Sequence, residues 1–407
     1  MTYINHSFDL TSKKWHNRIK YMIEQNRTKV LIFSVTYFPF VGGAEVALHE
    51  ITKRLTDVKF DLITAKFSQN LLNSEVVDNI TVYRVGQGKK IDKYLYPLRA
   101  FFLARKLNRQ NNYHLIWAMM ATWAGMAALV FKLFHPKTKY LLTLQSGDSD
   151  SFIRKRTWFW YPIYRQIYIC ANHIQAISHW LAKRARSYGY KKEISIIPNG
   201  VDLVKMQNSI NREQGIKLKN KLQIPKNNKI IFTSSRLVKK NDLATLIKSI
   251  NLLVTDYELL VTLVIAGSGK LEQKLKQLTK DLKLENHVIF LGQIDYDEIS
   301  KYYASADIFV RPSLSEGQGI AFIEAMAAGL PIIATPVGGI PDFLLDKKTG
   351  LFCQVNNPGD LAEKIKLLLA DKELYVEIQK NGLELVKQKY DWNLVAAKMK
   401  EIFNNLI

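Results

Sequence analysis

Short runs of apolar residues alternate along the chain with longer segments in which apolar positions recur every three or four residues. Such runs are typical of strands buried in a parallel sheet, and the periodic segments are typical of helices that cover it. Strands are expected at residues 30–35, 60–64, 81–85, 115–119, 140–144, 174–177, 194–197, 230–234, 261–266, 287–291, 308–311 and 332–335. The clearest helices between them are expected at residues 44–55, 242–253, 271–282 and 321–328. Because the alternation occurs in both halves, it predicts an α/β protein with two doubly wound, Rossmann-like parallel domains.

The alternation fades over residues 201–221, which are rich in Asn, Gln, Lys and Ser. We therefore expect a first domain over residues 1–205 and a second over 206–389. Residues 392–407 carry a helical apolar stripe, so a C-terminal helix over about 390–407 is a candidate to pack back on the first domain. Two such domains that face each other form a cleft, and ligands bind there at the carboxyl ends of the strands.

Several features indicate a globular protein of the reducing cytoplasm. Of the 407 residues, 47% are hydrophobic and 23% are charged, values that exclude a disordered or fibrous chain. The uncharged run 115–131 is shorter than the roughly 20 residues of a membrane-spanning helix, and it predicts a strand, a turn and a helix instead. Residues 1–29 are polar and lack the apolar core of a secretory signal, and Cys170 and Cys353 form neither a metal-ligand spacing nor a disulfide framework.

The positive charge is concentrated in the first half of the chain. Residues 1–200 hold 30 Lys and Arg against 12 Asp and Glu, whereas residues 201–407 hold 28 against 24, for a total net charge of +22. Such a surface attracts phosphates, either of nucleic acid or of an anionic membrane. Segments 94–102 and 153–164 mix basic residues with Tyr and Trp, so peripheral contact with the inner face of the cytoplasmic membrane is one expectation. The alternative is that these aromatic residues belong to the core.

Two glutamates, Glu316 and Glu324, stand eight residues apart where a strand ends and a helix begins. Gly317 and Gly319 between them allow the backbone to approach a ligand, and N–H groups at the start of the helix can bind phosphate. The helix is rich in Ala and looks buried, so Glu324 needs a partner for its carboxylate. The simpler interpretations are a loop carboxylate at Glu316 and a solvated helix face at Glu324.

Further candidate residues follow other predicted strands. Arg236 and Lys240 come directly after the strand at 230–234 and suit a diphosphate, although they could be solvated charges. Gly42 and Gly43 follow the first strand and open a helix, which is a weak signal for a phosphate cradle and also fits a plain tight turn.

These segments together resemble the signature of the retaining glycosyltransferases of family 4, which have the GT-B fold. The resemblance rests on the E-x7-E pair and on four further segments, SRLVKKN at 235–241, IPNGVD at 197–202, GGAE at 42–45 and ATPVGGIP at 334–341. The match covers almost the whole chain, and it is densest from 230 to 345.

The resemblance implies a role for each matching position. Glu324 would bind the ribose hydroxyls of a nucleotide sugar, and Glu316 would contact the transferred sugar near its reacting carbon. Arg236 and Lys240 would neutralise the leaving diphosphate in place of a metal. The backbone of Gly317, Gln318, Gly319 and Ile320 would approach the sugar and phosphates, and Gly42 and Gly43 would face them across the cleft.

The sequence departs from the family pattern at two positions and contains one competing motif. Gln145 stands where relatives commonly carry a histidine, so a side-chain general base is doubtful there, although Gln145 could contact the sugar or acceptor. Gln318 replaces an apolar residue common in relatives. The D-x-D at 148–150 resembles the metal motif of the other main glycosyltransferase fold, but Asp295-Tyr-Asp297 is a second copy and the rest of the chain does not match that fold.

The resemblance therefore implies a hexosyltransferase-type enzyme that needs neither metal nor cofactor. It would move a sugar from a UDP- or GDP-sugar to an acceptor hydroxyl, with retention, in polysaccharide or glycolipid synthesis. The acceptor would be a glycan or a lipid-linked molecule, and nucleic acid is not an expected partner. Two alternatives stay open, a sugar-nucleotide epimerase or phosphorylase on the same fold and a nucleic-acid binder without catalysis.

Overall fold

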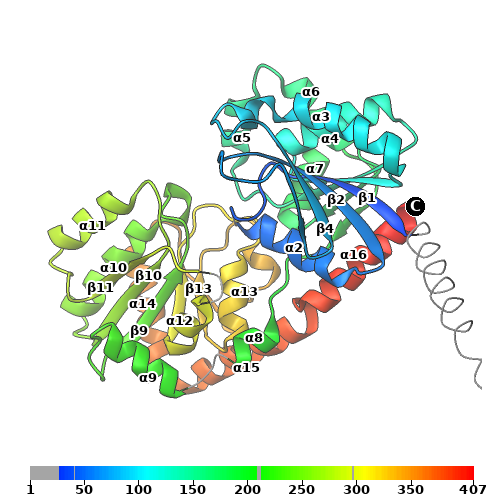
Figure 1. Ribbon diagram of the computed structural model, residues 1–407. Coiled ribbons are helices and arrows are strands. Elements are labelled where there is room, and N and C mark those ends of the chain that lie inside the picture. Colours follow the sequence, from blue (N-terminus) through cyan, green and yellow to red (C-terminus); the bar gives the residue numbers. More distant parts are fainter. Residues whose placement is uncertain (1–26, 41, 209–211, 296–297) are drawn as a thin grey trace, which may run out of the picture. The chain divides into compact units, whose positions relative to one another are not determined.

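The computed structural model describes residues 27–407 except 41, 209–211 and 296–297. The chain divides into two compact units (Figure 1). The first comprises residues up to Leu142 together with Cys170–His173 and Lys400–Ile407, and the second comprises Thr143–Ile169 and Ile174–Met399. The predicted boundary between 205 and 206 stays a prediction, and the N-terminal residues 1–26 lie outside the described part.

The first unit is built around a mainly parallel sheet. Its elements are β1 (Thr28–Phe33), α2 (Gly43–Arg54), β2 (Val58–Ala65), β3 (Ser74–Val77), β4 (Ile80–Val85), α3 (Asp92–Asn111), β5 (Leu115–Met119), α4 (Trp123–Phe134) and most of β6 (Lys139–Leu144). Within this unit the strand order is β3-β4-β2-β1-β5-β6. Strands β4, β2, β1 and β5 pair in parallel, whereas β3 is antiparallel to β4. The sequence did not predict β3, because the strand is only four residues long and its side chains are exposed or half-buried.

The second unit contains a six-stranded parallel sheet. Its elements are α5 (Asp150–Thr157), α6 (Tyr161–Ile169), most of β7 (His173–Ala176), α7 (His179–Ser187), β8 (Ile194–Ile196), α8 (Leu203–Asn208), α9 (Arg212–Lys221), β9 (Lys229–Ser234), α10 (Leu243–Thr255), β10 (Val261–Ala266), α11 (Glu272–Asp281), β11 (Val288–Gly292), α12 (Ile299–Ser305), β12 (Ile308–Arg311), α13 (Ile320–Ala327), β13 (Ile332–Ala334), β14 (Leu351–Phe352), α14 (Pro358–Ala370), α15 (Lys372–Lys389) and most of α16 (Trp392–Leu406). The strand order is β11-β10-β9-β12-β13-β14.

Strand β9 shows why this sheet is covered on both faces. Ile230 and Phe232 belong to one buried cluster together with residues of α12 and α13, whereas Ile231 belongs to another together with residues of α10 and α14. Successive side chains of a strand point to opposite faces, so an unbroken apolar run requires helices on both sides. The prediction of two parallel α/β domains is therefore confirmed, as are the predicted strands and helices to within about two residues.

The sequence predicted the elements of the run 115–131 but missed two helices after residue 201. The segment 201–221, where the alternation faded, contains the helices α8 and α9. Helix α8 has only six residues, too few to show a helical period, and the sequence of α9 is mostly polar. The uncharged run 115–131 forms β5 and most of α4 as predicted. Within the described residues, no helix combines the length and the hydropathy that crossing a membrane requires.

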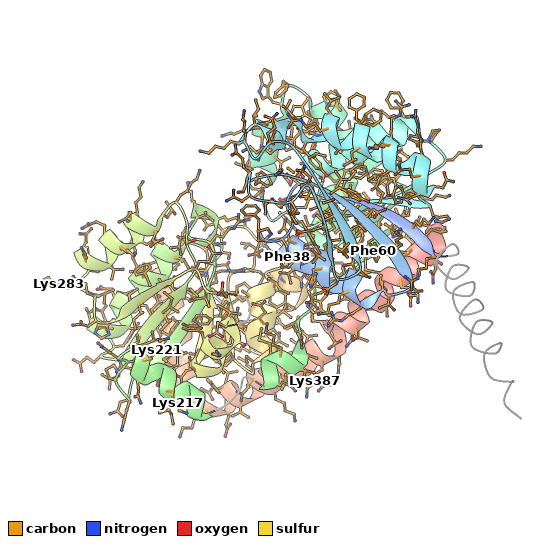
Figure 2. The ribbon with its side chains drawn as sticks, in the orientation of Figure 1. Phe38, Phe60, Lys217, Lys221, Lys283 and Lys387 are labelled. Carbon is orange, nitrogen blue, oxygen red and sulfur yellow. The ribbon has the colours of Figure 1, made fainter. Side chains whose placement is uncertain are left out.

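The C-terminal helix α16 begins in the second unit, and its last turns belong to the first. In the first unit, Lys400 forms an ion pair with Asp57 at 2.8 Å. The ring of Phe403 lies 6.3 Å from that of Phe60 on β2 and 5.4 Å from that of Trp117 on β5, measured between centroids. The side chain of Phe60 is labelled in Figure 2, where it lies on the sheet of the first unit. These contacts fix the end of the chain on the first sheet.

Candidate active site

Three of the predicted site residues of the second unit follow the carboxyl ends of β9 and β12. In the strand order of this sheet, β10 and β11 lie on one side of β9, and the chain then returns to place β12 on the other side. The loops after β9 and β12 consequently diverge at a topological switch point, the place where open parallel sheets bind ligands. Arg236 and Lys240 follow β9, and Glu316 follows β12.

Glu316 is held by a cation that sequence reasoning missed. Arg311, the last residue of β12, donates from Nη2 to Glu316 Oε2 at 2.6 Å, and the side chains are only 7% and 17% exposed. The backbone N–H of Gly317 donates to the other carboxylate oxygen at 3.0 Å. The Arg311 guanidinium also donates to the Ser234 carbonyl at 3.3 Å and lies over the Phe322 ring. Glu316 is thus a fixed, shielded carboxylate rather than a solvated loop residue.

Glu324 is buried on α13, and its carboxylate has the partner that burial requires. The hydroxyl of Tyr303 donates to Glu324 Oε2 at 2.8 Å, and Ser234 Oγ lies 2.7 Å from the same hydroxyl. Burial is the largest influence on this carboxyl and raises its pKa from 4.5 to about 7, against the opposing effects of Tyr303 and Arg311. The buried helix expected from the sequence is confirmed, and the simpler interpretation of Glu324 on a solvated helix face is wrong.

The two glutamates belong to one polar network. Arg311 binds Glu316 and the carbonyl of Ser234, and the hydroxyl of Ser234 lies against Tyr303, which binds Glu324. Ser234 ends β9 and Arg311 ends β12, so the network crosses the switch point. No motif marked Arg311 or Tyr303, because a strand end and a buried tyrosine fit an ordinary core equally well.

The two predicted diphosphate ligands are placed differently from each other. Lys240 is half-buried in the short 3-10 helix Lys239–Asn241, and its ammonium lies 3.5 Å from Asp148 Oδ1. The carbonyl of Lys240 accepts from the backbone of Leu314 at 2.7 Å, which ties the β9 loop to the β12 loop. Arg236 is exposed. Its guanidinium forms neither hydrogen bond nor ion pair with any residue of the described ranges.

The backbone around Glu316 is crowded by glycines from other loops. A Cβ on Gly338, whose φ is +59°, would stand 1.8 Å from the carbonyl oxygen of Glu316. A Cβ on Gly147 would stand 2.5 Å from the backbone nitrogen of Gly317. The Gly338–Gly339 pair of the ATPVGGIP segment therefore lets two loops of the second unit meet at Glu316.

Gln145 and Gln318 both bind Asn199, the asparagine of the IPNGVD segment. Gln145 and Asn199 exchange two side-chain hydrogen bonds of 3.1 Å each. Gln318 is 2% exposed, accepts from the Asn199 backbone N–H at 2.7 Å and donates to its carbonyl at 3.0 Å. The side chain of Gln318 thus anchors the glycine loop to Asn199, and its predicted contact with the donor stays a prediction.

The start of α13 suits an anion. Gly319 is its N-terminal cap, with φ +93°, and Ile320 is its first residue. Because glycine has no side chain, it leaves the first N–H groups of the helix without a side-chain cap.

Gly42 and Gly43, at the start of α2, lie in the first unit, where the Glu45 carboxylate would contact a Cβ on Gly42. Their contact with a donor stays a prediction.

The D-x-D segment is engaged in ion pairs. Asp148 lies beside Lys240, and Asp150 lies 2.8 Å from Arg184 Nε. In the second copy, Asp297 lies outside the described residues. Across the ranges that the structure covers, His, Cys, Asp and Glu side chains form no group of three or more that could hold a metal ion.

Comparison with known proteins assigns both halves of the chain. Residues 41–205 match the family described as Glycosyltransferase Family 4, and residues 215–385 match the family described as Glycosyl transferases group 1. Together the two matches cover most of the chain.

Individual relatives agree with this assignment. An uncharacterized glycosyltransferase of Methanocaldococcus jannaschii, MJ1178, is 27% identical over 93% of this chain and 98% of its own. The alpha-monoglucosyldiacylglycerol synthase of Streptococcus pneumoniae is 33% identical over 40% of this chain and 37% of its own. The structure of Anabaena Alr3699/HepE with UDP-glucose is similar at a TM-score of 0.77 and 20% identity, over 93% of this chain and 100% of that one. The chain belongs to the group 1 and family 4 glycosyltransferases, and its two parallel α/β domains form the GT-B fold.

Proposed function

We propose that the enzyme transfers a sugar from a nucleotide diphosphate-sugar, with UDP or GDP as the nucleotide, to an acceptor hydroxyl with retention at the anomeric carbon. The network that joins Glu316 to Glu324 through Arg311, Ser234 and Tyr303 carries this proposal. It places two carboxylates at the switch point of a parallel sheet, where nucleotides bind. Glu316 is paired with a guanidinium, whereas Glu324 is buried and accepts a hydrogen bond from a tyrosine. The similar Anabaena structure, which was solved with UDP-glucose, supports a donor of this class.

The residues around the switch point have separate roles in donor binding. Glu324 accepts hydrogen bonds from the ribose hydroxyls, and Tyr303 orients it. The N-terminus of α13, with Gly317, Gly319 and Ile320, faces the phosphates and the sugar. Arg236 and Lys240 neutralise the diphosphate as it departs, and Lys240 leaves Asp148 to do so.

The reaction replaces one glycosidic bond by another on the same face of the sugar. The bond from the anomeric carbon to the diphosphate oxygen breaks, and a bond to the acceptor oxygen forms through an oxocarbenium-like state. The acceptor proton passes to the departing phosphate oxygen, since Gln145 cannot act as a base. Glu316, fixed by Arg311, lies near the reacting carbon, and its negative charge stabilises the positive charge that develops there.

The cations take the place of a metal ion in this proposal, and no cofactor takes part. Glycans or lipid-linked molecules of cell-surface polysaccharide or glycolipid synthesis are the proposed acceptors, at the inner face of the cytoplasmic membrane. The similarity to the streptococcal synthase, whose name describes a glucosyl lipid as its product, supports a lipid-linked acceptor.

A thermal-shift panel of UDP-, GDP- and ADP-sugars with and without EDTA tests the donor and the absence of a metal. One class of sugar nucleotide at about 100 times its dissociation constant is expected to stabilise the protein by about 2.7 kcal/mol. EDTA is expected to leave that stabilisation unchanged. Failure of every sugar nucleotide to raise the melting temperature would refute the proposal, and loss of the shift in EDTA would refute metal independence.

Product analysis separates a transferase from an epimerase or a phosphorylase on the same fold. Turnover of the donor alone, or a requirement for inorganic phosphate, would indicate an epimerase or a phosphorylase instead of a transferase.

A further inference from the structure

Six large apolar side chains stand exposed on two neighbouring helices of the first unit. They are between 38% and 65% exposed, and we name them the α3–α4 ridge: Tyr94, Leu95, Leu98, Phe102, Leu133 and Phe134. Figure 1 shows α3 and α4 side by side, and the ring centroids of Phe101 on α3 and Phe134 on α4 lie 5.0 Å apart. An apolar surface that spans two packed helices is uncommon on a protein that is fully surrounded by water.

The ridge is not the core-facing side of α3. The buried residues of this helix include Tyr96, Ala100, Ala104 and Leu107. Tyr94, Leu98 and Phe102 recur every four residues on another side, so they form a second apolar stripe. A helix that only covers a sheet is expected to be polar on its outer face. The outer stripe of α3 therefore requires a different explanation from packing within the unit.

Positive charge surrounds the ridge. Residues 93–147 contain eight Lys and Arg and neither Asp nor Glu. Lys106 and Arg109 are exposed on α3, and the Arg105 guanidinium lies over the rings of Phe101 and Phe134 at 5.7 and 6.0 Å. The acidic residue at the start of the helix, Asp92, is buried and paired with Arg99. The surface thus combines exposed apolar groups with exposed cations.

We propose that the α3–α4 ridge inserts into an anionic lipid bilayer. Apolar side chains gain free energy when they enter the boundary between headgroups and acyl chains, and nearby cations gain from anionic headgroups. Nucleic acid would match the cations but leave the apolar stripe in water, so the bilayer fits both features better. The inference rests on the proposed function, because it brings the enzyme to lipid-linked acceptors.

Co-sedimentation with vesicles tests the ridge. The probes are vesicles of equal parts phosphatidylcholine and phosphatidylglycerol, and vesicles of phosphatidylcholine alone. The unchanged protein is expected to bind the anionic vesicles, and more strongly at low salt than at high salt. The double variant Leu98→Gln/Phe102→Gln is expected to lose about tenfold or more in vesicle affinity. The double variant Lys106→Gln/Arg109→Gln is expected to lose most of the salt dependence.

A matched control separates the ridge from general surface hydrophobicity. Val376 on α15 of the second unit is 57% exposed, close to the 59% of Leu98, and Val376→Gln is expected to leave vesicle binding unchanged. Equal binding by the unchanged protein and Leu98→Gln/Phe102→Gln would overturn the inference. So would a dimer of the unchanged protein that becomes monomeric in the variant, because a second copy would then cover the ridge.

Donor binding distinguishes this inference from the proposed function. The thermal shift with a sugar nucleotide is expected to persist in Leu98→Gln/Phe102→Gln, because these positions lie outside the donor site. If vesicle binding follows the expected pattern but no sugar nucleotide raises the melting temperature, the proposed function is refuted and the role of the α3–α4 ridge in membrane binding is supported. If a sugar nucleotide raises the melting temperature but the protein binds no vesicles, only the membrane inference is refuted.

Discussion

Replacing Arg236 by alanine is expected to lower kcat about a hundredfold to a thousandfold while leaving the fold intact. Negative charge grows on the departing diphosphate in the transition state, and a positioned donor at such a charge is typically worth this factor. Because Arg236 is exposed, its removal should change the free energy of unfolding by about 0.5 kcal/mol or less. Steady-state kinetics and denaturant unfolding of the same preparation measure the two effects.

Lys239 supplies a matched control for this experiment. It is an exposed cation in the same loop, and the family resemblance assigns it no role. Lys239→Ala is therefore expected to retain nearly full kcat. Equal activity of the Arg236→Ala and Lys239→Ala variants would contradict the role of Arg236. The corresponding change at Glu316 is harder to interpret, because it also leaves the shielded guanidinium of Arg311 without its partner.

Replacing Glu324 by glutamine is expected to weaken donor binding and stabilise the free protein. The ribose hydroxyls lose a charged acceptor, which is typically worth about tenfold to a hundredfold in affinity. The protein no longer has to bury a carboxylate, while the glutamine oxygen can still accept from Tyr303. Opposite effects on binding and stability are expected where a residue serves a ligand rather than the fold.

The stability effect depends on pH in a defined way. The folded state raises the Glu324 pKa from 4.5 to about 7, so the folded protein binds this proton more tightly than the unfolded chain. Stability is therefore lost as the pH rises from about 4.5 to about 7, and the total loss is on the order of 3 kcal/mol. The advantage of Glu324→Gln should accordingly grow through this interval and stay constant above it.

Chemical denaturation at several pH values, together with titration of the donor, checks both parts. A variant that is less stable than the unchanged protein at pH 8 would contradict the view that Glu324 is a costly buried carboxylate. A donor affinity that does not change in Glu324→Gln would contradict the proposal that Glu324 binds the ribose hydroxyls.

The fold could be predicted from the sequence because both sheets are buried on two faces. Runs such as 261–266 are apolar throughout, and the structure places them in strands with the predicted bounds. Strand β3 and the helices α8 and α9 escaped prediction. Strand β3 and α8 are only four and six residues long, and the sequence of α9 is mostly polar, so none of them shows a clear period.

The site could be predicted only in part. Glu316 and Glu324 stood out because carboxylates beside glycines and inside an Ala-rich helix conflict with ordinary packing. Arg311 and Tyr303 did not, because their importance lies in contacts made by residues distant in sequence, such as the bond from Tyr303 to Glu324. The role of Gln318 as an anchor for Asn199 likewise depends on a contact across 119 positions.

A crystal structure of the enzyme with its sugar-nucleotide donor tests the central claim most directly. We expect the nitrogens of Arg236 and Lys240 about 3 Å from diphosphate oxygens, and Glu324 within hydrogen-bond distance of the ribose hydroxyls. Glu316 should lie beside the anomeric carbon of the sugar. A diphosphate bound away from both cations, or a ribose that does not contact Glu324, would contradict the account.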